Sequence, residues 1–441
     1  MTKLQMRQKR FKRILQPFQQ FIQAETFSGI LLLFFTVVAL LWTNTGIRDS
    51  YFSLWHTHLR FGFGEFLLDE SLHFFINDGL MAVFFFLVGL EIKREIMAGE
   101  LSTPRLAALP VIAALGGMLF PALIYVAFNI GTPSVHGWGI PTATDIAFAI
   151  GIMALVGKKV PLGLKVFLAA LAIADDMGAV VVIALFYSSG ISLFWLFAAL
   201  AFFALQLLMN RMDVHKNTIY AILGIGLWFA LWKTGIHPTI AGVLSAIAIP
   251  ARTKLPEGNN FTDSARHYLR EYDSAPKAPE NPLVTREEQE ALLGLVTISE
   301  KAQTPLQRIE HKLQPWVSYF IMPLFALANA GVVIGNEISE AYTMPSTIGV
   351  MLGLFIGKPL GISLFSFLSV KLGLASLPHG ANWRSMLGTG ALAGIGFTMS
   401  IFIANLAFGT ESPFLSFAKI GILSASLLSG LTGWLILRSS R

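Results

Sequence analysis

The chain has 441 residues, of which 54% are hydrophobic and 13% charged, and its formal net charge is +6 at pH 7. Soluble globular domains carry about 25% charged residues. This composition, with a mean hydropathy of +0.64, therefore excludes an ordinary soluble protein and indicates that the solvent is a lipid bilayer. The absence of cysteine excludes disulfides and thiolate metal sites.

Apolar stretches that could cross the bilayer recur along the whole chain. A helix needs about 20 apolar residues to span roughly 30 Å of hydrocarbon, and the sequence predicts twelve such spans. In chain order they are 28–45, 71–90, 107–128, 140–156, 162–187, 192–209, 218–232, 237–251, 315–336, 347–370, 384–408 and 416–437. We therefore expect an all-α polytopic membrane protein that forms one transmembrane domain over residues 1–441.

The distribution of Lys and Arg explains the positive net charge better than nucleic acid binding does, and no nucleic acid partner is expected. These residues gather at both termini and in alternate connections between the predicted spans. Basic connections stay on the cytoplasmic side, so both termini are predicted to be cytoplasmic. The basic stretch "KLQMRQKRFKR" before the first span should lie against anionic lipid. No cleavage site follows it, which favours a retained first helix over a removed signal peptide.

Two connections are long enough to have structure of their own. Residues 46–70 contain "WHTHLRFGFGEF", whose alternation around Gly62 and Gly64 predicts a hairpin on the outer side. Residues 252–313 are charged and include the Pro-rich "SAPKAPENP", which predicts a long, solvated cytoplasmic loop. The part "REEQEALLGLVTISEK" within it fits an amphipathic helix.

The run "ALAIADDMGAVVVIALF", residues 170–186, places Asp175 and Asp176 inside an apolar span. A charge at the centre of a membrane helix costs about 2.5–3.5 kcal/mol even on insertion scales, and such residues usually face a cavity and mark a pathway. Neighbours on a helix point about 100° apart, so both carboxylates can border one polar cavity. The alternative is a protonated Asp that forms a helix–helix hydrogen bond.

Two other spans are poor continuous helices. "GIPTATDIAFAIG" places Asp145 after Gly139, Pro141 and two threonines, of which Thr144 is its neighbour. "GTGALAGIGFTMS", residues 388–400, is rich in glycine. Interrupted spans in the two halves of a chain are typical of transporter sites built from broken helices, although the glycines of the second segment could equally form a packing face.

Lys358 lies inside the apolar run "GLFIGKPLGISLF", immediately before Pro359. Apolar sequence on both sides prevents its ammonium group from reaching the interface. It therefore needs an acidic partner, for which Asp145, Asp175 and Asp176 are the candidates.

These four charges suit the exchange of small cations for protons. Carboxylate and carbonyl oxygens are ligands for hard cations, and the chain lacks the Cys or closely spaced His pairs that softer metals prefer. Two adjacent carboxylates resist ionising together, and either a proton or a metal cation can compensate the charge. Proton and cation would then compete for one site, with no cofactor and no enzymatic step.

Six segments together resemble the NhaA family of bacterial sodium/proton antiporters. In chain order they read "FFFLVGLEIKREI", "TATDIAFAIG", "AIADDMGAVVVIALFY", "PLFALANAGV", "GKPLGISLF" and "GIGFTMSIFI". The resemblance covers nearly the whole chain outside residues 252–300. It implies inverted-topology repeats of spans 3–5 and 10–12, with broken helices in spans 4 and 11.

The resemblance also assigns roles to the buried charges. Asp175 and Asp176 match the aspartates that bind Na+ or Li+ and carry protons, and Lys358 matches a lysine that pairs with Asp175. Asp145, with Thr144 beside it, matches an acid at the crossing of the broken helices that balances the positive helix N-termini. Family members take up more than one proton per exported Na+, so the transport is electrogenic.

Other residues match segments of the family that sense pH at the cytoplasmic side. They are Glu91, Lys93, Arg94 and Glu95 at the end of span 2, and Arg308, Glu310 and His311 before span 9. His237, at the start of span 8, matches a histidine of the family that is linked to pH response and dimer contact. A plain interfacial ion-pair network is the alternative for the charged groups. Gln307 replaces a commonly basic residue, and the connection 252–313 is longer than usual, so both depart from the family pattern.

The hairpin within 46–70 is expected to hold a homodimer together in the bacterial inner membrane.

Three other classes of membrane protein are the alternatives. An intramembrane aspartyl protease would carry a Gly-x-Gly-Asp signature, which the chain lacks. The second alternative is a passive cation channel, which uphill Na+ movement driven by a proton gradient would exclude. A proton-coupled symporter of an organic solute also remains open, and ion exchange without added solute would exclude that.

Overall fold

A computed structural model describes residues 25–63, 66–188, 190–253, 261–277, 283–335 and 337–440. The basic stretch before the first predicted span lies outside these residues, as do two parts of the connection 252–313, residues 254–260 and 278–282.

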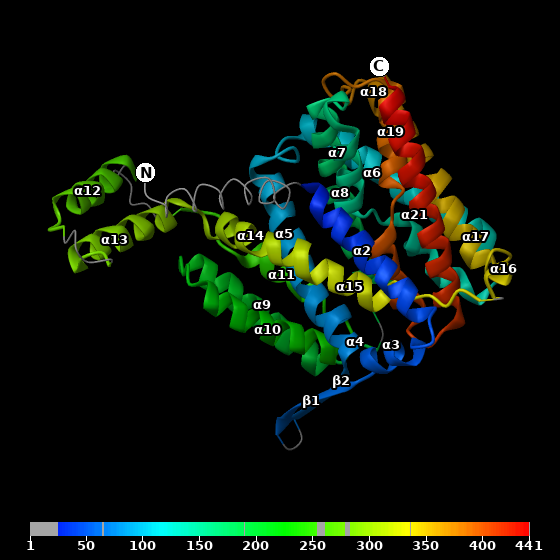
Figure 1. Cartoon of the computed structure of the whole chain (residues 1–441), viewed down its shortest axis with the longest axis horizontal. Coiled ribbons are helices and arrows are strands. Elements are labelled where there is room, and N and C mark those ends of the chain that lie inside the picture. The colour runs from blue at the N-terminus through cyan, green and yellow to red at the C-terminus, as the bar shows by residue number, and fades with distance from the viewer. Residues whose placement is uncertain are drawn as a thin grey trace, which may run out of the picture.

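The described chain is a bundle of helices with one small β-hairpin at one end (Figure 1). The first part contains α2 (Glu25–Thr43), α3 (Arg48–Trp55), β1 (His58–Phe63), β2 (Phe66–Ser71), α4 (Leu72–Phe74), η1 (Phe75–Leu80), α5 (Met81–Ala98), α6 (Pro104–Asn129), η2 (Pro133–Thr142), α7 (Ile146–Val156), η3 (Gly157–Lys159) and α8 (Leu162–Phe186). The second part begins with α9 (Leu193–Arg211), α10 (Asn217–Thr234), α11 (Ile240–Ala248), α12 (Phe261–Ser274), α13 (Arg286–Ala302), α14 (Pro305–Trp316), η4 (Val317–Ile321) and α15 (Met322–Asn329). It ends with α16 (Glu337–Ala341), α17 (Pro345–Leu352), η5 (Gly353–Gly357), α18 (Lys358–Lys371), α19 (Trp383–Ala393), α20 (Phe397–Phe408) and α21 (Pro413–Ser439).

The membrane-spanning character expected from composition is present in the fold. Within the described residues, 6 helices are long and apolar enough to cross a bilayer, or up to 9 if each of 3 bent pairs counts as one span. α11 has only 9 residues, which cover roughly 14 Å at 1.5 Å per residue. This length is less than half of the hydrocarbon thickness. The helix is short because residues around His237 and Pro238, which the sequence assigned to span 8, form a turn. The full set of twelve spans stays a prediction.

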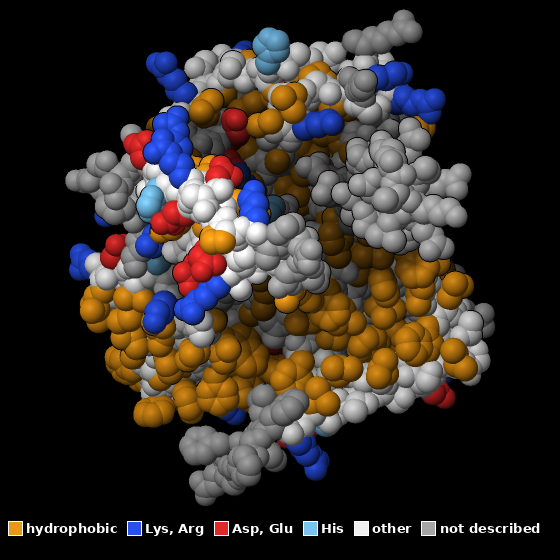
Figure 2. Space-filling view, turned by 60° about the vertical axis from the view of Figure 1, so that its left-hand side comes forward, with side chains coloured by type: hydrophobic (Ala, Val, Ile, Leu, Met, Phe, Trp, Pro, Cys, Tyr) orange, Lys and Arg blue, Asp and Glu red, His pale blue; other side chains and the backbone are white. Residues whose placement is uncertain are grey.

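The surface of the bundle carries the hydrophobic side chains that lipid requires. Figure 2 shows them as a broad band, with charged side chains above and below it. On α9 and α10 the exposed apolar residues include Phe194, Phe197, Ile222 and Ile225. Exposed apolar surface of this extent marks a membrane or protein contact, and the composition favours the membrane.

The hairpin predicted within residues 46–70 lies at one end of the bundle, which we call the hairpin end (Figure 1). β1 and β2 pair antiparallel, with His58 opposite Ser71. Before them, α3 packs against the bundle, where the Tyr51 hydroxyl donates a hydrogen bond to the Leu327 carbonyl over 2.8 Å. The hairpin therefore occupies the later part of the predicted segment, from residue 58 onward, because α3 belongs to the core.

The long connection at the opposite end has more helix than the sequence predicted (Figure 1). α13 corresponds to the predicted amphipathic helix and begins with a capping box at Thr285 and Glu288. α12 packs on α13 but was not predicted, because its many charged residues suggest a solvated loop. The sequence therefore predicted α13 but not α12, which is an additional helix in this connection.

Close packing of α6 on α18 fixes the position of Lys358. A Cβ atom on Gly116 or on Gly361 would collide with the carbonyl oxygen of the other glycine. Small residues let the two backbones approach in this way. The π-helical turn η5 precedes Lys358, and it accommodates Pro359, whose ring would clash with a carbonyl of a regular helix.

Candidate ion-binding site

Two broken helices cross at the centre of the bundle. η2 and α7 are bent by 42° around residues 143–145, and α19 and α20 are bent by 46° around residues 394–396. Backbone groups join the two breaks, since the Asp145 amide donates to the Ile395 carbonyl over 2.6 Å. The Ser400 hydroxyl donates to the Ile140 carbonyl over 2.7 Å. Irregular backbone at membrane depth is tolerated because its polar groups are satisfied in this way inside the protein.

Asp145 lies between the N-termini of α7 and α20. Its carboxylate caps α7 by accepting from the Phe148 amide over 3.2 Å. The other oxygen accepts from the Thr398 amide over 3.1 Å and from the Thr398 hydroxyl. Each helix N-terminus carries roughly half a positive charge, so two of them together can balance one carboxylate. Asp145 is 1% exposed, and its charge is thus compensated without a cationic side chain.

Asp175 has a cationic partner. The Lys358 ammonium lies 2.6 Å from its Oδ2 atom, and both side chains are almost completely buried. The ammonium group also donates to the Thr142 carbonyl in the first break. Thr144 Oγ1 lies 2.7 Å from the same carboxylate oxygen and 2.9 Å from the Ala393 carbonyl in the second break. The ion pair is therefore tied to both broken helices.

Asp176 is the acid that this arrangement leaves uncompensated. It is 1% exposed, and Lys358 forms its ion pair with Asp175. The Oδ1 atoms of Asp175 and Asp176 are both buried without a hydrogen-bond partner among the described residues. A buried carboxylate in this situation needs a proton or a cation. The site thus offers two free oxygens on adjacent residues to either one.

No group of three or more His, Asp or Glu residues within the described ranges could hold a resident metal ion. The candidate site instead combines two carboxylates with the Thr144 hydroxyl and backbone carbonyls. Such oxygen donors suit a hard cation that binds and leaves.

The residues predicted to sense pH do not form one cluster. At the end opposite the hairpin, Arg94 lies 3.1 Å from Glu95 and 3.0 Å from Glu310, which joins α5 to α14. Glu91 lies one turn earlier on α5. Lys93 turns away and donates to the Ile247 carbonyl over 2.7 Å.

The remaining three predicted residues lie apart from this network. Arg308 lies 3.5 Å from Glu300, and His311 is exposed. His237 lies near the hairpin end, where its Nε2 atom is 3.1 Å from Asp78.

Sequence reasoning missed Thr398, which provides two of the hydrogen bonds to Asp145. A signal was available, since "GIGFTMS" places a threonine just after a glycine-rich break, where helix N-terminal groups converge on anions. The contribution of the Thr142 and Ala393 carbonyls could not be predicted, because it depends on how the two breaks cross in space.

The family model described as Na+/H+ antiporter 1 matches residues 19–437. The chain is 50% identical over 427 residues to the Na(+)/H(+) antiporter NhaA of Oleidesulfovibrio alaskensis, covering 97% of this chain and 94% of that protein. It is 49% identical over 415 residues to the NhaA of Wolinella succinogenes, covering 94% and 91% of the two chains. With the NhaA of Helicobacter pylori it shares 48% identity over 420 residues, or 95% and 94% of the chains. The buried aspartates, the crossing of two broken helices and these similarities lead to one conclusion: the chain belongs to the Na+/H+ antiporter 1 family.

Proposed function

We propose that this protein is an electrogenic antiporter that exports Na+ or Li+ in exchange for protons, with cation and protons competing for Asp175 and Asp176. Relatives at 48–50% identity carry the name Na(+)/H(+) antiporter, which supports sodium/proton exchange. The main support for this site is that the Oδ1 atoms of Asp175 and Asp176 are both buried and have no hydrogen-bond partner among the described residues.

The proposed cycle follows from the charges at the site. Asp145 is balanced by two helix N-termini and Asp175 by Lys358, so Asp176 takes up a proton when no cation is bound. An arriving Na+ replaces that proton and draws the Asp175 carboxylate away from Lys358, which can then release a second proton. Two protons exchanged for one Na+ would move net charge, so the membrane potential would drive export.

The proposal includes the surroundings of the site. The two bent helix pairs, with similar angles of 42° and 46°, support inverted repeats of spans 3–5 and 10–12 within a set of twelve spans. We infer a location in the bacterial inner membrane with both termini cytoplasmic. The proposal also includes a homodimer through β1 and β2 and a regulation of the transport by pH through the Arg94 network. Its role in the cell would be pH homeostasis and salt tolerance.

Sealed vesicles that contain the purified protein test this function. Addition of Na+ or Li+, without any organic solute, should cause proton movement that K+ does not cause. Asp176→Asn should abolish it, because an amide neither takes up a proton nor offers a full charge to the cation. Asp69→Asn, on the exposed hairpin, is the matched control and should retain it. Proton movement that persists in Asp176→Asn would refute the site.

A further inference from the structure

The second break, residues 394–396, lies in a narrow space between η5 and α21. A Cβ atom on Gly394 would come within 2.5 Å of the Leu354 carbonyl oxygen of η5 and within 2.8 Å of Ser429 Oγ of α21. Real Cβ atoms essentially never make contacts this short, so only glycine fits at this position. α21 is therefore close enough to hold the backbone of the break in place.

Ser426 of α21 binds the first amide of α20. Its side chain is buried, and its hydroxyl oxygen accepts from the Phe397 amide over 3.2 Å. The following amide, that of Thr398, donates to Asp145 over 3.1 Å. The first N–H groups of a helix have no partner within the helix, and they carry its positive end charge. These two bonds thus divide the N-terminus of α20 between a neutral hydroxyl and a carboxylate.

Other bonds of the second break run to the first break and to the central site. The Ile395 carbonyl accepts from the Asp145 amide over 2.6 Å. The Ala393 carbonyl accepts from Thr144, whose hydroxyl also lies 2.7 Å from Asp175 Oδ2. A tilt of α20 would therefore change the surroundings of both Asp145 and Asp175.

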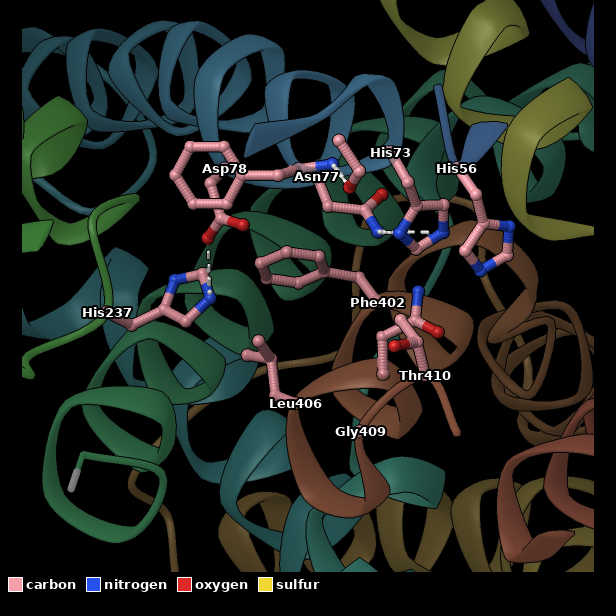
Figure 3. A pocket seen from close by; sticks show the side chains of 12 residues that line it. His56, His73, Asn77, Asp78, His237, Phe402, Leu406, Gly409 and Thr410 are labelled. Carbon is pink, nitrogen blue, oxygen red and sulfur yellow. Dashed lines mark hydrogen bonds and ion pairs between the residues drawn. The ribbon is translucent and has the colours of Figure 1, made fainter. Parts of the chain in front are cut away.

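The opposite end of α20 borders open space near the hairpin end. Phe402 and Leu406 lie in the wall of a cavity of about 310 Å³ (Figure 3). At this end the Asn405 side chain donates to Asn329 Oδ1 over 2.6 Å. This bond can serve as a pivot, because a space without side chains provides no contacts that oppose a small tilt. The direction of α20 then depends on the hydrogen bonds at its N-terminus.

We propose that Ser426 is a positioning residue for the central site, whose bond to the Phe397 amide sets the affinity for the exported cation. The hydroxyl does not touch the ion. It keeps α20 in the direction in which the Thr398 amide, and not the Phe397 amide, serves Asp145. This inference rests on the proposed function, because it takes the central carboxylates as the ligands of the cation.

Removal of the hydroxyl leaves the Phe397 amide as a buried donor without an acceptor. Such a donor costs more than the lost bond itself, and the Asp145 carboxylate is the strongest acceptor at this helix end. We expect α20 to tilt until the amide reaches this carboxylate, which draws the Ala393 carbonyl away from Thr144. The cation then meets a less ordered set of ligands at Asp175.

The test is Na+-dependent proton movement in sealed vesicles at one fixed pH, which gives the apparent KM for Na+ and the maximal rate. Ser426→Ala should raise the apparent KM about threefold to tenfold, the equivalent of one hydrogen bond, with a smaller change in the maximal rate. Ser426→Cys should do the same, because a thiol fills the space of the hydroxyl but accepts hydrogen bonds weakly. Ser426→Thr keeps a hydroxyl and should retain the KM of the parent.

Ser429→Ala is the matched control. Ser429 lies on the same helix and is fully buried beside the same break, and its Oγ atom has no hydrogen-bond partner among the described residues. Its removal leaves no backbone amide unsatisfied, so the apparent KM should not change. In the Thr398→Val background, Ser426→Ala should raise the KM by a smaller factor than in the parent, because both residues act on Asp145 through the same helix end.

An unchanged KM in both Ser426→Ala and Ser426→Cys would overturn the positioning role, as would an equal rise of the KM in Ser429→Ala. A lower melting temperature with an unchanged KM would overturn it too, since Ser426 would then only stabilise the fold. Absence of Na+-dependent proton movement in the unmodified protein would instead contradict the proposed function itself.

Discussion

Lys358 is the only cationic side chain paired with the central carboxylates in the described structure. Lys358→Ala should lower the thermal stability of the purified protein, because removing one partner of a buried ion pair costs about 3–5 kcal/mol. Lys371→Ala, at the exposed end of the same helix, is the control and should change stability little. Equal melting temperatures for the two variants would show that Asp175 does not depend on Lys358.

Lys358→Arg tests whether the lysine exchanges a proton. Arginine preserves the charge and the ion pair but stays protonated at physiological pH, whereas a buried lysine can lose its proton. We expect a folded protein whose exchange activity requires a higher pH or moves less charge per Na+. The pH dependence of exchange and the current across the vesicle membrane measure this, and values equal to those of the parent would make Lys358 a structural residue only.

Thr398 should matter for exchange through Asp145. Thr398→Val leaves Asp145 short of one hydrogen bond, and an unsatisfied buried group costs about 1–3 kcal/mol. Both exchange activity and thermal stability should therefore fall, while Thr398→Ser should preserve most of each. Thr432→Val is the matched control, because that exposed hydroxyl bonds only within its own helix. A Thr398→Val protein with full activity would show that the two helix N-termini suffice for Asp145.

At the residue scale, sequence alone identified the four buried charges that meet at the central site, because charge inside an apolar run is visible without coordinates. It left three candidates for the partner of Lys358, and only the crossing of the helices selects Asp175. Thr398 and the carbonyls of Thr142 and Ala393 were not identified, since backbone acceptors leave no trace in a sequence and threonine is common in membrane helices.

At the scale of elements, the contact between α5 and α14 should set a pH dependence. Burial raises the pKa of Glu310, which lies before the membrane-spanning part of its helix, and the Arg94 guanidinium opposes that rise. Arg94→Ala should therefore raise the pKa further, so that Glu310 loses its proton only at a higher pH. If deprotonation of Glu310 activates exchange, the activation midpoint shifts upward.

The control for Arg94→Ala is Arg286→Ala, which removes an exposed ion pair of the same length, 3.0 Å, from α13. The pH profile of Na+-dependent proton movement compares the two variants. An unchanged midpoint in Arg94→Ala would favour the alternative, in which these charges form only a structural network at the interface.

The hairpin can be removed without disturbing the bundle if α3 is kept. The Leu72 amide donates to the Thr57 carbonyl over 2.9 Å, so two glycines can replace residues 58–70 and leave Ser71 to cap α4. We expect the shortened protein to be a monomer by light scattering in detergent and to keep its exchange activity, because β1 and β2 are the proposed dimer contact. Dimers that persist would place the contact elsewhere on the molecule.

The elements also show where sequence patterns lose information. Long apolar runs predicted α6, α8 and α21 within a few residues, because the hydrocarbon thickness fixes their length. α11 and α12 differ from the prediction because short or strongly charged helices take their stability from packing, which no local pattern records.

At the scale of the whole molecule, three of the four charges at the central site are balanced within the protein. Asp145 faces two helix N-termini, Asp175 faces Lys358, and Asp176 alone needs a proton or a cation. Either a proton or a cation on Asp176 offsets the excess negative charge of the empty site, and the loss of the Lys358 proton in the proposed cycle would then leave the Na+-bound site one charge more negative than the protonated site. This provides a physical reason why the site should exchange the two and not pass ions freely.

Competition at Asp176 is the central claim, and the most direct measurement is the Na+ dependence of proton movement in sealed vesicles at several pH values. We predict that, at pH values above the activation midpoint assigned to Glu310, the apparent KM for Na+ rises as the pH falls, whereas the maximal rate at saturating Na+ stays nearly constant. An apparent KM for Na+ that does not change with pH, combined with a maximal rate that does, would contradict the account, because protons would then act away from the site that binds Na+.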